Sequence, residues 1–205
     1  MNTVVLATSN QHKVEEIQAM LTELPITFLS LADFPDLPEV IEDGTTCQEN
    51  AVKKAREIAT GTGHWALADD TGLEVDALDG RPGVYAARYA GEGATYSDNC
   101  EKLLEELQQI PVGQRGARFL TVMALSDPEG QTETVEGVLQ GQITQQFYGS
   151  QGFGYDPVFY VPNAHKTLAE MTLDEKNELS HRGQALRLAK DLLNRRVENT
   201  PSVGA

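Results

Sequence analysis

Residues 3–14 read TVVLATSNQHKV, and this stretch predicts the first three elements of the fold. Residues 3–7 are aliphatic or β-branched without interruption, which is typical of a strand buried on both faces. Thr8-Ser9-Asn10 has turn chemistry, and Ser9 or Asn10 can cap a helix. The apolar residues that follow recur on one helical face, at Val14, Ile17, Leu21 and Leu24. The N-terminus therefore predicts a strand, a loop and a helix.

The next part of the chain continues this alternation. A short strand around residues 26–29 precedes a helix that begins near Thr46, because Thr46 and Glu49 form a capping box. An apolar strand over residues 65–68 is expected to stop at the polar residues 69–72.

The second half of the chain predicts an acidic helix over residues 97–109 and two strands over residues 118–126 and 132–143. The turn at 127–130 joins these strands into an antiparallel pair. Thr172 and Glu175 cap a last helical region, and the final helix of this region carries Leu179, Leu186, Ala189 and Leu193 on one side. Helices and strands that alternate around an antiparallel pair predict an α/β fold with a mixed sheet.

The composition limits the classes of partner. The 205 residues include 16 Lys and Arg against 31 Asp and Glu, for a net charge of −15. We therefore expect no nucleic-acid partner, since a phosphate backbone is bound by basic surfaces. Apolar runs are too short for a signal peptide or a membrane span, so no membrane partner is expected. Cys47 and Cys100 lack metal or redox spacing, which favours reduced thiols and a cytoplasmic location.

The loop after the first strand is a candidate phosphate site. It comprises Thr8, Ser9, Asn10, Gln11, His12 and Lys13. Free N–H groups at a helix N-terminus attract anions, and the polar side chains and the lysine add donors. The alternative is an ordinary strand-to-helix turn with a solvated lysine.

Asp69-Asp70-Thr71-Gly72 is a candidate cation site. Adjacent acids after a buried strand are costly unless they bind a cation, and carboxylate oxygens favour Mg²⁺. Glu42 is a further acidic residue, on a loop just before a helix, that could belong to this site. Asp43 lies beside a turn glycine and is expected to be solvated. The alternative is a β-turn in which an aspartate caps a backbone N–H.

Two further segments carry candidate binding residues. Gly152-Phe153-Gly154-Tyr155-Asp156 places an aromatic ring between glycines, which suits the approach of a flat ligand. Lys176 can reach a phosphate, and His181 and Arg182 can donate to the carbonyl oxygens of a base. The alternatives are a glycine-rich turn with a buried phenylalanine, a surface histidine and an arginine paired with an acid. The histidines and cysteines show no zinc spacing, and no Walker or Gly-x-Ser-x-Gly motif is present.

The order of these motifs along the chain is similar to that of a known protein family. The series runs through Thr8-Ser9-Asn10-x-x-Lys13, Glu49-Asn50-Ala51-x-x-Lys54, Ala68-Asp69-Asp70-Thr71-Gly72, Gly83-Val84-Tyr85-x-x-Arg88, Gly152-Phe153-Gly154-Tyr155-Asp156-Pro157 and Ser180-His181-Arg182-Gly183. It resembles the inosine triphosphate pyrophosphatase family over residues 3 to about 195. Ser9 stands where the family usually has glycine, and Cys47 where an aromatic residue is common.

The resemblance implies two lobes around a long mixed β-sheet, with the active site in the interlobe cleft. It implies one domain over residues 1–196 and a homodimer. The tail over 197–205 is expected to be frayed because its end lacks apolar periodicity. The implied reaction is Mg²⁺-dependent hydrolysis of ITP, dITP or XTP to the monophosphate and pyrophosphate.

The resemblance also implies roles for individual residues. Asp70 would activate water, and Glu42 and Asp70 would hold Mg²⁺. The substrate would be bound by residues 8–13, Lys54, Thr71, Phe153, Gly154, Tyr155, Asp156, Lys176, His181 and Arg182. Two alternatives stay open: a pyrophosphatase or phosphatase for other modified nucleotides, and a nucleotide-binding module without catalysis.

Overall fold

The computed structural model describes residues 2–198, whose strands form one sheet in the order β2-β1-β3-β5-β6-β7-β8, with β4 paired to β3. The strands are β1 (Thr3–Leu6), β2 (Thr27–Ser30), β3 (Trp65–Val75), β4 (Pro82–Gly83), β5 (Gly116–Ser126), β6 (Thr132–Ile143), β7 (Phe159–Val161) and β8 (Lys166–Thr167). The α-helices are α1 (Gln11–Leu21), α2 (Cys47–Thr62), α3 (Tyr96–Glu106), α4 (Leu173–Leu179) and α5 (His181–Glu198). Because β1 pairs in parallel with β2 and β3, and β7 pairs antiparallel with β6 and β8, the sheet is mixed. The predicted α/β class is confirmed.

The chain divides into two compact units. The first comprises residues up to Asp70, residues 122–136 and residues from Gln184 onward. The second comprises Thr71–Thr121 and Gly137–Gly183. The boundaries pass through β3, β5 and β6, so each of these strands contributes residues to both units.

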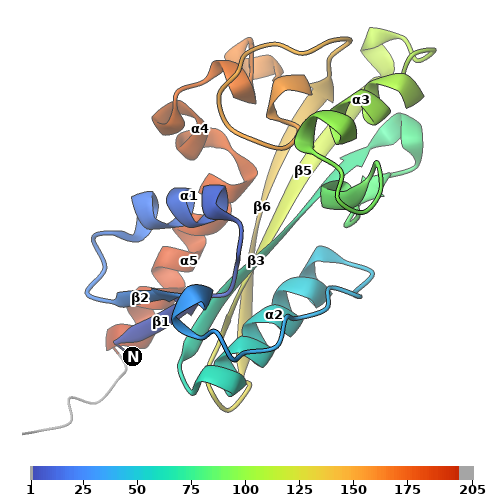
Figure 1. Ribbon diagram of the computed structural model, residues 1–205. Helices are drawn as coiled ribbons and strands as arrows, with labels where there is room; N and C mark the ends of the chain where they lie inside the picture. The colour runs from blue at the N-terminus through green and yellow to red at the C-terminus, as the bar shows by residue number, and fades with distance from the viewer. Residues whose placement is uncertain (1, 199–205) are drawn as a thin grey trace, which may run out of the picture. The chain divides into compact units, whose positions relative to one another are not determined.

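The core of the first unit forms where α1 and α5 pack on one face of its strands. Strand residues alternate between the two faces, so Val4, Leu6 and Leu67 share one side. These residues join Ile17 and Leu21 of α1 and a stripe of α5 in one buried cluster. The other face is covered by α2 through a narrow stripe of Ala51, Ala55, Ile58 and Ala59 (Figure 1). Small side chains on α2 let its backbone lie close to the strands.

The core of the second unit packs α3 against its own strand segments. Leu103 and Leu107 at the end of α3 lie in one buried cluster with Leu73 of β3 and Phe159 of β7. The cluster extends to the short turns after β8, which contribute Leu168 and Met171. Each unit therefore has its own apolar core.

Several local predictions are confirmed. The side chain of Asn10 caps α1, and Thr46 caps α2 in a capping box with Glu49. The turn between β5 and β6 is closed by the bonds Asp127 N to Gln131 O and Gly130 N to Asp127 O. No helix within the described range is long and apolar enough to span a membrane.

Several boundaries differ from the prediction; α3, for example, ends at Glu106 and not at residue 109. β3 does not stop at Ala68 but continues through the acidic residues to Val75, because two lysines neutralise the acids within the strand. Leu179, predicted on the final helix, instead ends α4, since Ser180 has an extended backbone and its hydroxyl accepts from Gly183 N at 3.0 Å. Of the predicted tail, Val197 and Glu198 lie in α5, and residues 199–205 lie outside the described residues.

Two leucines of α5 provide a test of the core in the first unit. Leu186 is fully buried in the cluster, whereas Leu188 is 46% exposed. Leu186→Ala should lower the free energy of unfolding by about 2–5 kcal/mol, because it leaves a cavity. Leu188→Ala should change it by less than about 0.5 kcal/mol. Urea unfolding of both variants measures the difference, and equal losses would contradict this packing of α5.

Candidate active site

The loop between β1 and α1 is organised by its own side chains. Thr8 Oγ1 accepts from Asn10 N at 3.2 Å, and Asn10 Oδ1 accepts from the N–H groups of His12 at 3.1 Å and Lys13 at 3.4 Å. Ser9, Gln11 and His12 are exposed. The loop has the capped geometry of a strand-to-helix turn, and its phosphate-binding role stays a prediction.

Lys13 is not the solvated lysine of the alternative interpretation. Its Nζ lies 3.0 Å from Asp69 Oδ2, and the Asp69 side chain is completely buried. One helical turn into α1, the side chain therefore extends to β3, where it neutralises a buried acid. The first strand and helix are thereby tied to β3 by an ion pair.

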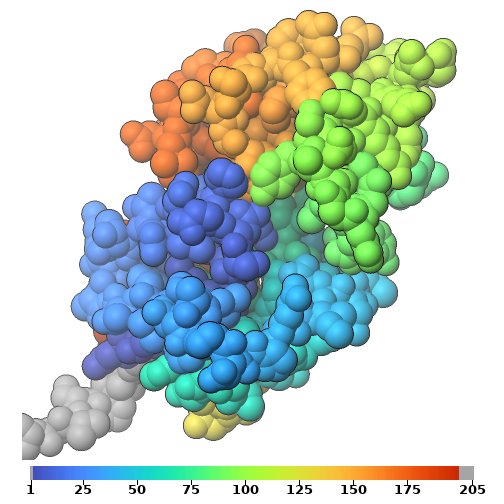
Figure 2. All heavy atoms as spheres, in the orientation of Figure 1, coloured from blue at the N-terminus to red at the C-terminus, as the bar shows by residue number. Residues whose placement is uncertain are grey.

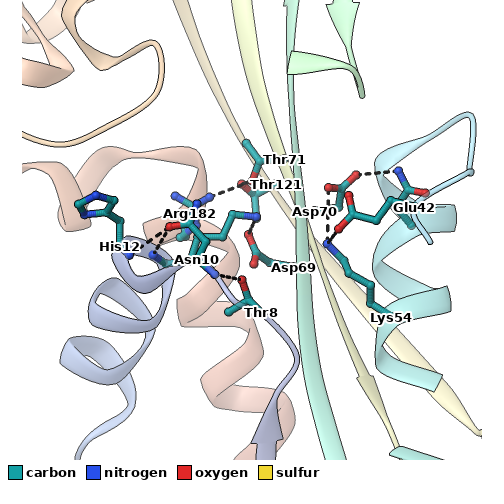
Figure 3. A network of polar contacts seen from close by, with 12 residues as sticks. Thr8, Asn10, His12, Glu42, Lys54, Asp69, Asp70, Thr71, Thr121 and Arg182 are labelled. Atoms are coloured by element: carbon teal, nitrogen blue, oxygen red, sulfur yellow. Dashed lines mark hydrogen bonds and ion pairs between the residues drawn. The ribbon is translucent and has the colours of Figure 1, made fainter. Parts of the chain in front are cut away.

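Asp69 and Asp70 lie on opposite faces of β3. Successive side chains of a strand point to opposite sides of the sheet, so two adjacent acids cannot both face one helix. Figure 3 shows Asp69 on the side of α1 and Asp70 on the side of α2. β1 ends beside this part of β3, since Ala7 N donates to Leu67 O. The acids therefore lie just beyond the carboxyl end of β1, where a parallel strand pair opens toward a ligand.

Two residues of α2 hold the carboxylate of Asp70. Asn50 Nδ2 donates to Oδ2 at 3.2 Å, and Lys54 Nζ lies 3.7 Å from Oδ1. The same lysine lies 2.7 Å from Glu42 Oε1, so one ammonium bridges two carboxylates (Figure 3). Asp43 agrees with the prediction of a solvated residue, since it is exposed and pairs at the surface with Lys53.

The charges around Asp70 act in opposite directions. Burial raises the pKa of Asp70 above its ordinary value and the charge of Glu42 adds to this, although Lys54 and Lys13 lower it. Burial lowers the pKa of Lys54, but the charges of Asp69, Asp70 and Glu42 outweigh it, so that this pKa is raised. Lys54 is therefore charged, and Asp70 is more basic than a solvated aspartate.

The donor set around Lys54 fits a magnesium ion. No group of three or more histidine, cysteine or acidic side chains within the described residues is arranged to hold a metal. Glu42 and Asp70 nevertheless face one shared cation, the Lys54 ammonium, and Mg²⁺ often binds through one or two carboxylates while keeping waters. Asp69 points to the other face of β3, so it does not belong to this donor set.

The second unit contains a hydroxyl pair held by an arginine. Arg182 Nη2 donates to Thr71 Oγ1 at 3.0 Å, and Thr71 Oγ1 lies 2.7 Å from Thr121 Oγ1. Arg182 is buried at the start of α5. This contact of Arg182 is made to a hydroxyl, whereas the alternative interpretation paired the arginine with an acid.

A second network in the same unit surrounds Phe153. Asp156 Oδ2 accepts from Phe153 N at 2.8 Å and lies 2.7 Å from Lys176 Nζ. The half-buried ring of Phe153 has Lys176 at 4.8 Å and Arg182 at 5.4 Å from its centroid. The structure therefore brings together three of the predicted residues, Asp156, Lys176 and Arg182, around Phe153.

Two predicted residues of this unit lie deeper than expected. The His181 ring is buried and stacks on Phe119, with centroids 4.3 Å apart. It is therefore not a surface histidine. The Tyr155 side chain belongs to the core, and its hydroxyl donates to Ala86 O at 2.8 Å. Gly154 has a φ of 63°, which glycine adopts without strain.

Two polar residues with contacts to the site were not among the predicted ones. Asn50 binds Asp70, and Thr121 binds Thr71. A sequence signal existed for Asn50, which precedes Lys54 by four residues and therefore shares its helix face. None existed for Thr121, because its contact with Thr71 depends on strand pairing.

The fold and these networks define a mixed α/β protein with paired lysines and carboxylates where β1 ends beside β3. Residues 4–192 match the model of the Ham1 family. A dITP/XTP pyrophosphatase of Geobacter sulfurreducens is 53% identical over 193 residues, which cover 94% of this chain and 97% of that protein. The solved HAM1 protein of Coxiella burnetii has a TM-score of 0.88 at 42% identity and covers 95% of this chain and 100% of its own. The Staphylococcus aureus Ham1 protein has a TM-score of 0.85 at 36% identity, with the same coverage. The chain belongs to the Ham1 family.

Removing one or the other charged neighbour of Asp70 should shift the pKa of Asp70 in opposite directions. Lys54→Met should raise the pKa of Asp70 further, because a lowering charge is removed. Glu42→Gln should lower it, because a like charge is removed. Carbon-13 NMR of the aspartate carboxyl groups, in buffer without divalent metal, follows both. If both variants moved the pKa in the same direction, the described network would be wrong.

Proposed function

We propose that this chain hydrolyses non-standard purine nucleoside triphosphates, dITP, ITP and XTP, to the monophosphate and pyrophosphate. The observation that carries the proposal is the buried Asp70 carboxylate, held by Asn50 and Lys54 while Lys13 lies beside the same strand. The relatives named dITP/XTP pyrophosphatase, about half identical over nearly the whole chain, support it.

The phosphate end of the substrate would be bound by the first unit. The capped loop at residues 8–10 and the ammonium of Lys13 lie at the start of α1, where the helix dipole attracts anions. Lys54 adds a second cation whose raised pKa keeps it charged. Two lysines would offset the negative charge that develops on the leaving pyrophosphate.

Asp70 would accept the proton of the attacking water. Its burial raises its pKa, which makes it a better base than a solvated aspartate. Glu42 and Asp70 would hold Mg²⁺, which, when bound, polarises a phosphoryl group and lowers the pKa of bound water. Asp69 would serve a different purpose, since it faces α1 and orients Lys13.

The base of the substrate would be bound by the residues around Phe153. The ring of Phe153 offers a flat face, and the buried Arg182 and His181 would donate to the 6-carbonyl of hypoxanthine or xanthine. Adenine has an amino group at that position, so binding it would leave buried donors unpaired at a cost of about 1–3 kcal/mol each.

A panel of triphosphates with Mg²⁺ tests the proposed function. ITP, dITP and XTP should release pyrophosphate, and kcat/KM for ATP should be lower by about tenfold or more, as one unpaired donor requires. Release of orthophosphate would indicate a phosphatase instead. Tight binding without any turnover would indicate a nucleotide-binding module.

Arg182→Ala is the matched variant for base selection. It should reduce the ratio of kcat/KM for ITP to that for ATP, mainly through slower turnover of ITP. An unmodified protein that hydrolyses ATP as efficiently as ITP would contradict the proposed role of these donors. The homodimer that the resemblance implies stays a prediction, which light scattering in solution can test.

A further inference from the structure

The loop that carries Glu42 has little regular structure of its own. Between β2 and α2 the only helical turn among the described residues is η1 (Leu31–Asp33), and most of residues 31–46 are at least partly exposed. Figure 2 shows residues of this segment, in light blue, at the surface of the first unit. The position of Glu42 therefore depends on side chains that fasten the loop to α2.

Asn50 fastens the loop from a buried position. Its side chain is 1% exposed, and Oδ1 accepts from Gly44 N at 2.8 Å. Because an N–H group must be matched by an oxygen, this contact fixes which end of the amide is Oδ1. The other end, Nδ2, then donates to Asp70 Oδ2 at 3.2 Å. One amide thus connects the loop to the strand.

Gly44 shows how close this approach is. A Cβ at this position would lie 2.5 Å from Asn50 Oδ1 and 2.8 Å from Glu49 Cβ. Any residue other than glycine would displace the loop from the amide. The close backbone approach is therefore a specific feature of this loop.

Asp70 is held at both of its oxygens by the same helix. Lys54 lies at Oδ1 and Asn50 donates to Oδ2, and the two residues are four positions apart on one face of α2. The lysine alone would leave the carboxylate free to rotate about its χ2 angle, because an ammonium is a point charge without a preferred plane. The directional N–H of Asn50 removes this freedom.

We propose that Asn50 is a positioning residue of the active site. It fixes the rotation of the Asp70 carboxylate and, through Gly44, the distance between the Glu42 loop and β3. This role rests on the proposed function, in which Asp70 accepts a proton and Glu42 lies beside it. Asn50 does not react; it determines where the two carboxylates are.

Asn50→Asp, Asn50→Leu and Glu49→Ala separate this role from a structural one. Aspartate keeps an oxygen for Gly44 N but loses the donor to Asp70, and leucine loses both. Glu49 fastens the same loop through Thr45 and Thr46 without contacting Asp70, so it is the matched control.

The expected result is a loss of kcat that follows the contact with Asp70. Asn50→Asp and Asn50→Leu should lower kcat for ITP by about tenfold or more with KM within about threefold, since misplacement costs the transition state and not substrate binding. Glu49→Ala should lower the Tm yet keep kcat within about threefold. Retained kcat in Asn50→Asp, or an equal loss in Glu49→Ala, would overturn the proposal.

Hydrogen exchange provides a measurement that does not depend on turnover. The Gly44 amide should be protected in the wild type and in Asn50→Asp, and should exchange faster in Asn50→Leu. Equal protection in all three would show that Asn50 does not hold the loop. If the wild type released no pyrophosphate from any triphosphate, the proposed function and the positioning of Asp70 would both be wrong. The exchange data would still decide whether Asn50 holds the loop.

Discussion

Two adjacent carboxylates lie inside the buried strand β3, and their charges must be neutralised where they stand. Removing a carboxylate from water costs several kcal/mol unless a partner compensates it. Asp69 has Lys13 at 3.0 Å, and Asp70 has Lys54 at 3.7 Å together with the Asn50 amide. These partners come from two different helices, so the alternation of side chains along one strand connects α1 and α2 to the same point of the sheet.

The same alternation of side chains along β3 gives the two acids different neighbours. Asp69, completely buried against Lys13, orients a cation beside the capped loop at the start of α1. Asp70 shares Lys54 with Glu42, so two carboxylates and one ammonium converge on the side of α2. The arrangement places an ammonium on one face of β3 and a carboxylate with a raised pKa on the other, and the proposed function uses the first for phosphate and the second as a base.

Local signals in the sequence predicted what local interactions determine. The caps at Asn10 and Thr46 and the turn after β5 depend on neighbouring residues, and all three are confirmed. The predicted end of β3 at Ala68 was wrong, because the lysines that allow the strand to continue come from distant segments. Leu179 was predicted on the apolar side of the final helix because its spacing to Leu186 fits one helix, although the structure ends α4 at Leu179 and begins α5 at His181. The burial of Tyr155 and the stacking of His181 depend on tertiary packing that no spacing reveals.

The two carboxylates have different roles in the proposed function, and steady-state kinetics of Asp69→Asn and Asp70→Asn with ITP distinguish these roles. Both changes are isosteric and adjacent. The amide introduced by Asp69→Asn would still offer Lys13 an oxygen, so kcat should stay within about tenfold of wild type, whereas loss of the general base in Asp70→Asn should lower kcat by about 10²–10⁴-fold. Equal losses of kcat in the two variants would contradict the account, because they would show that the two carboxylates act as one unit.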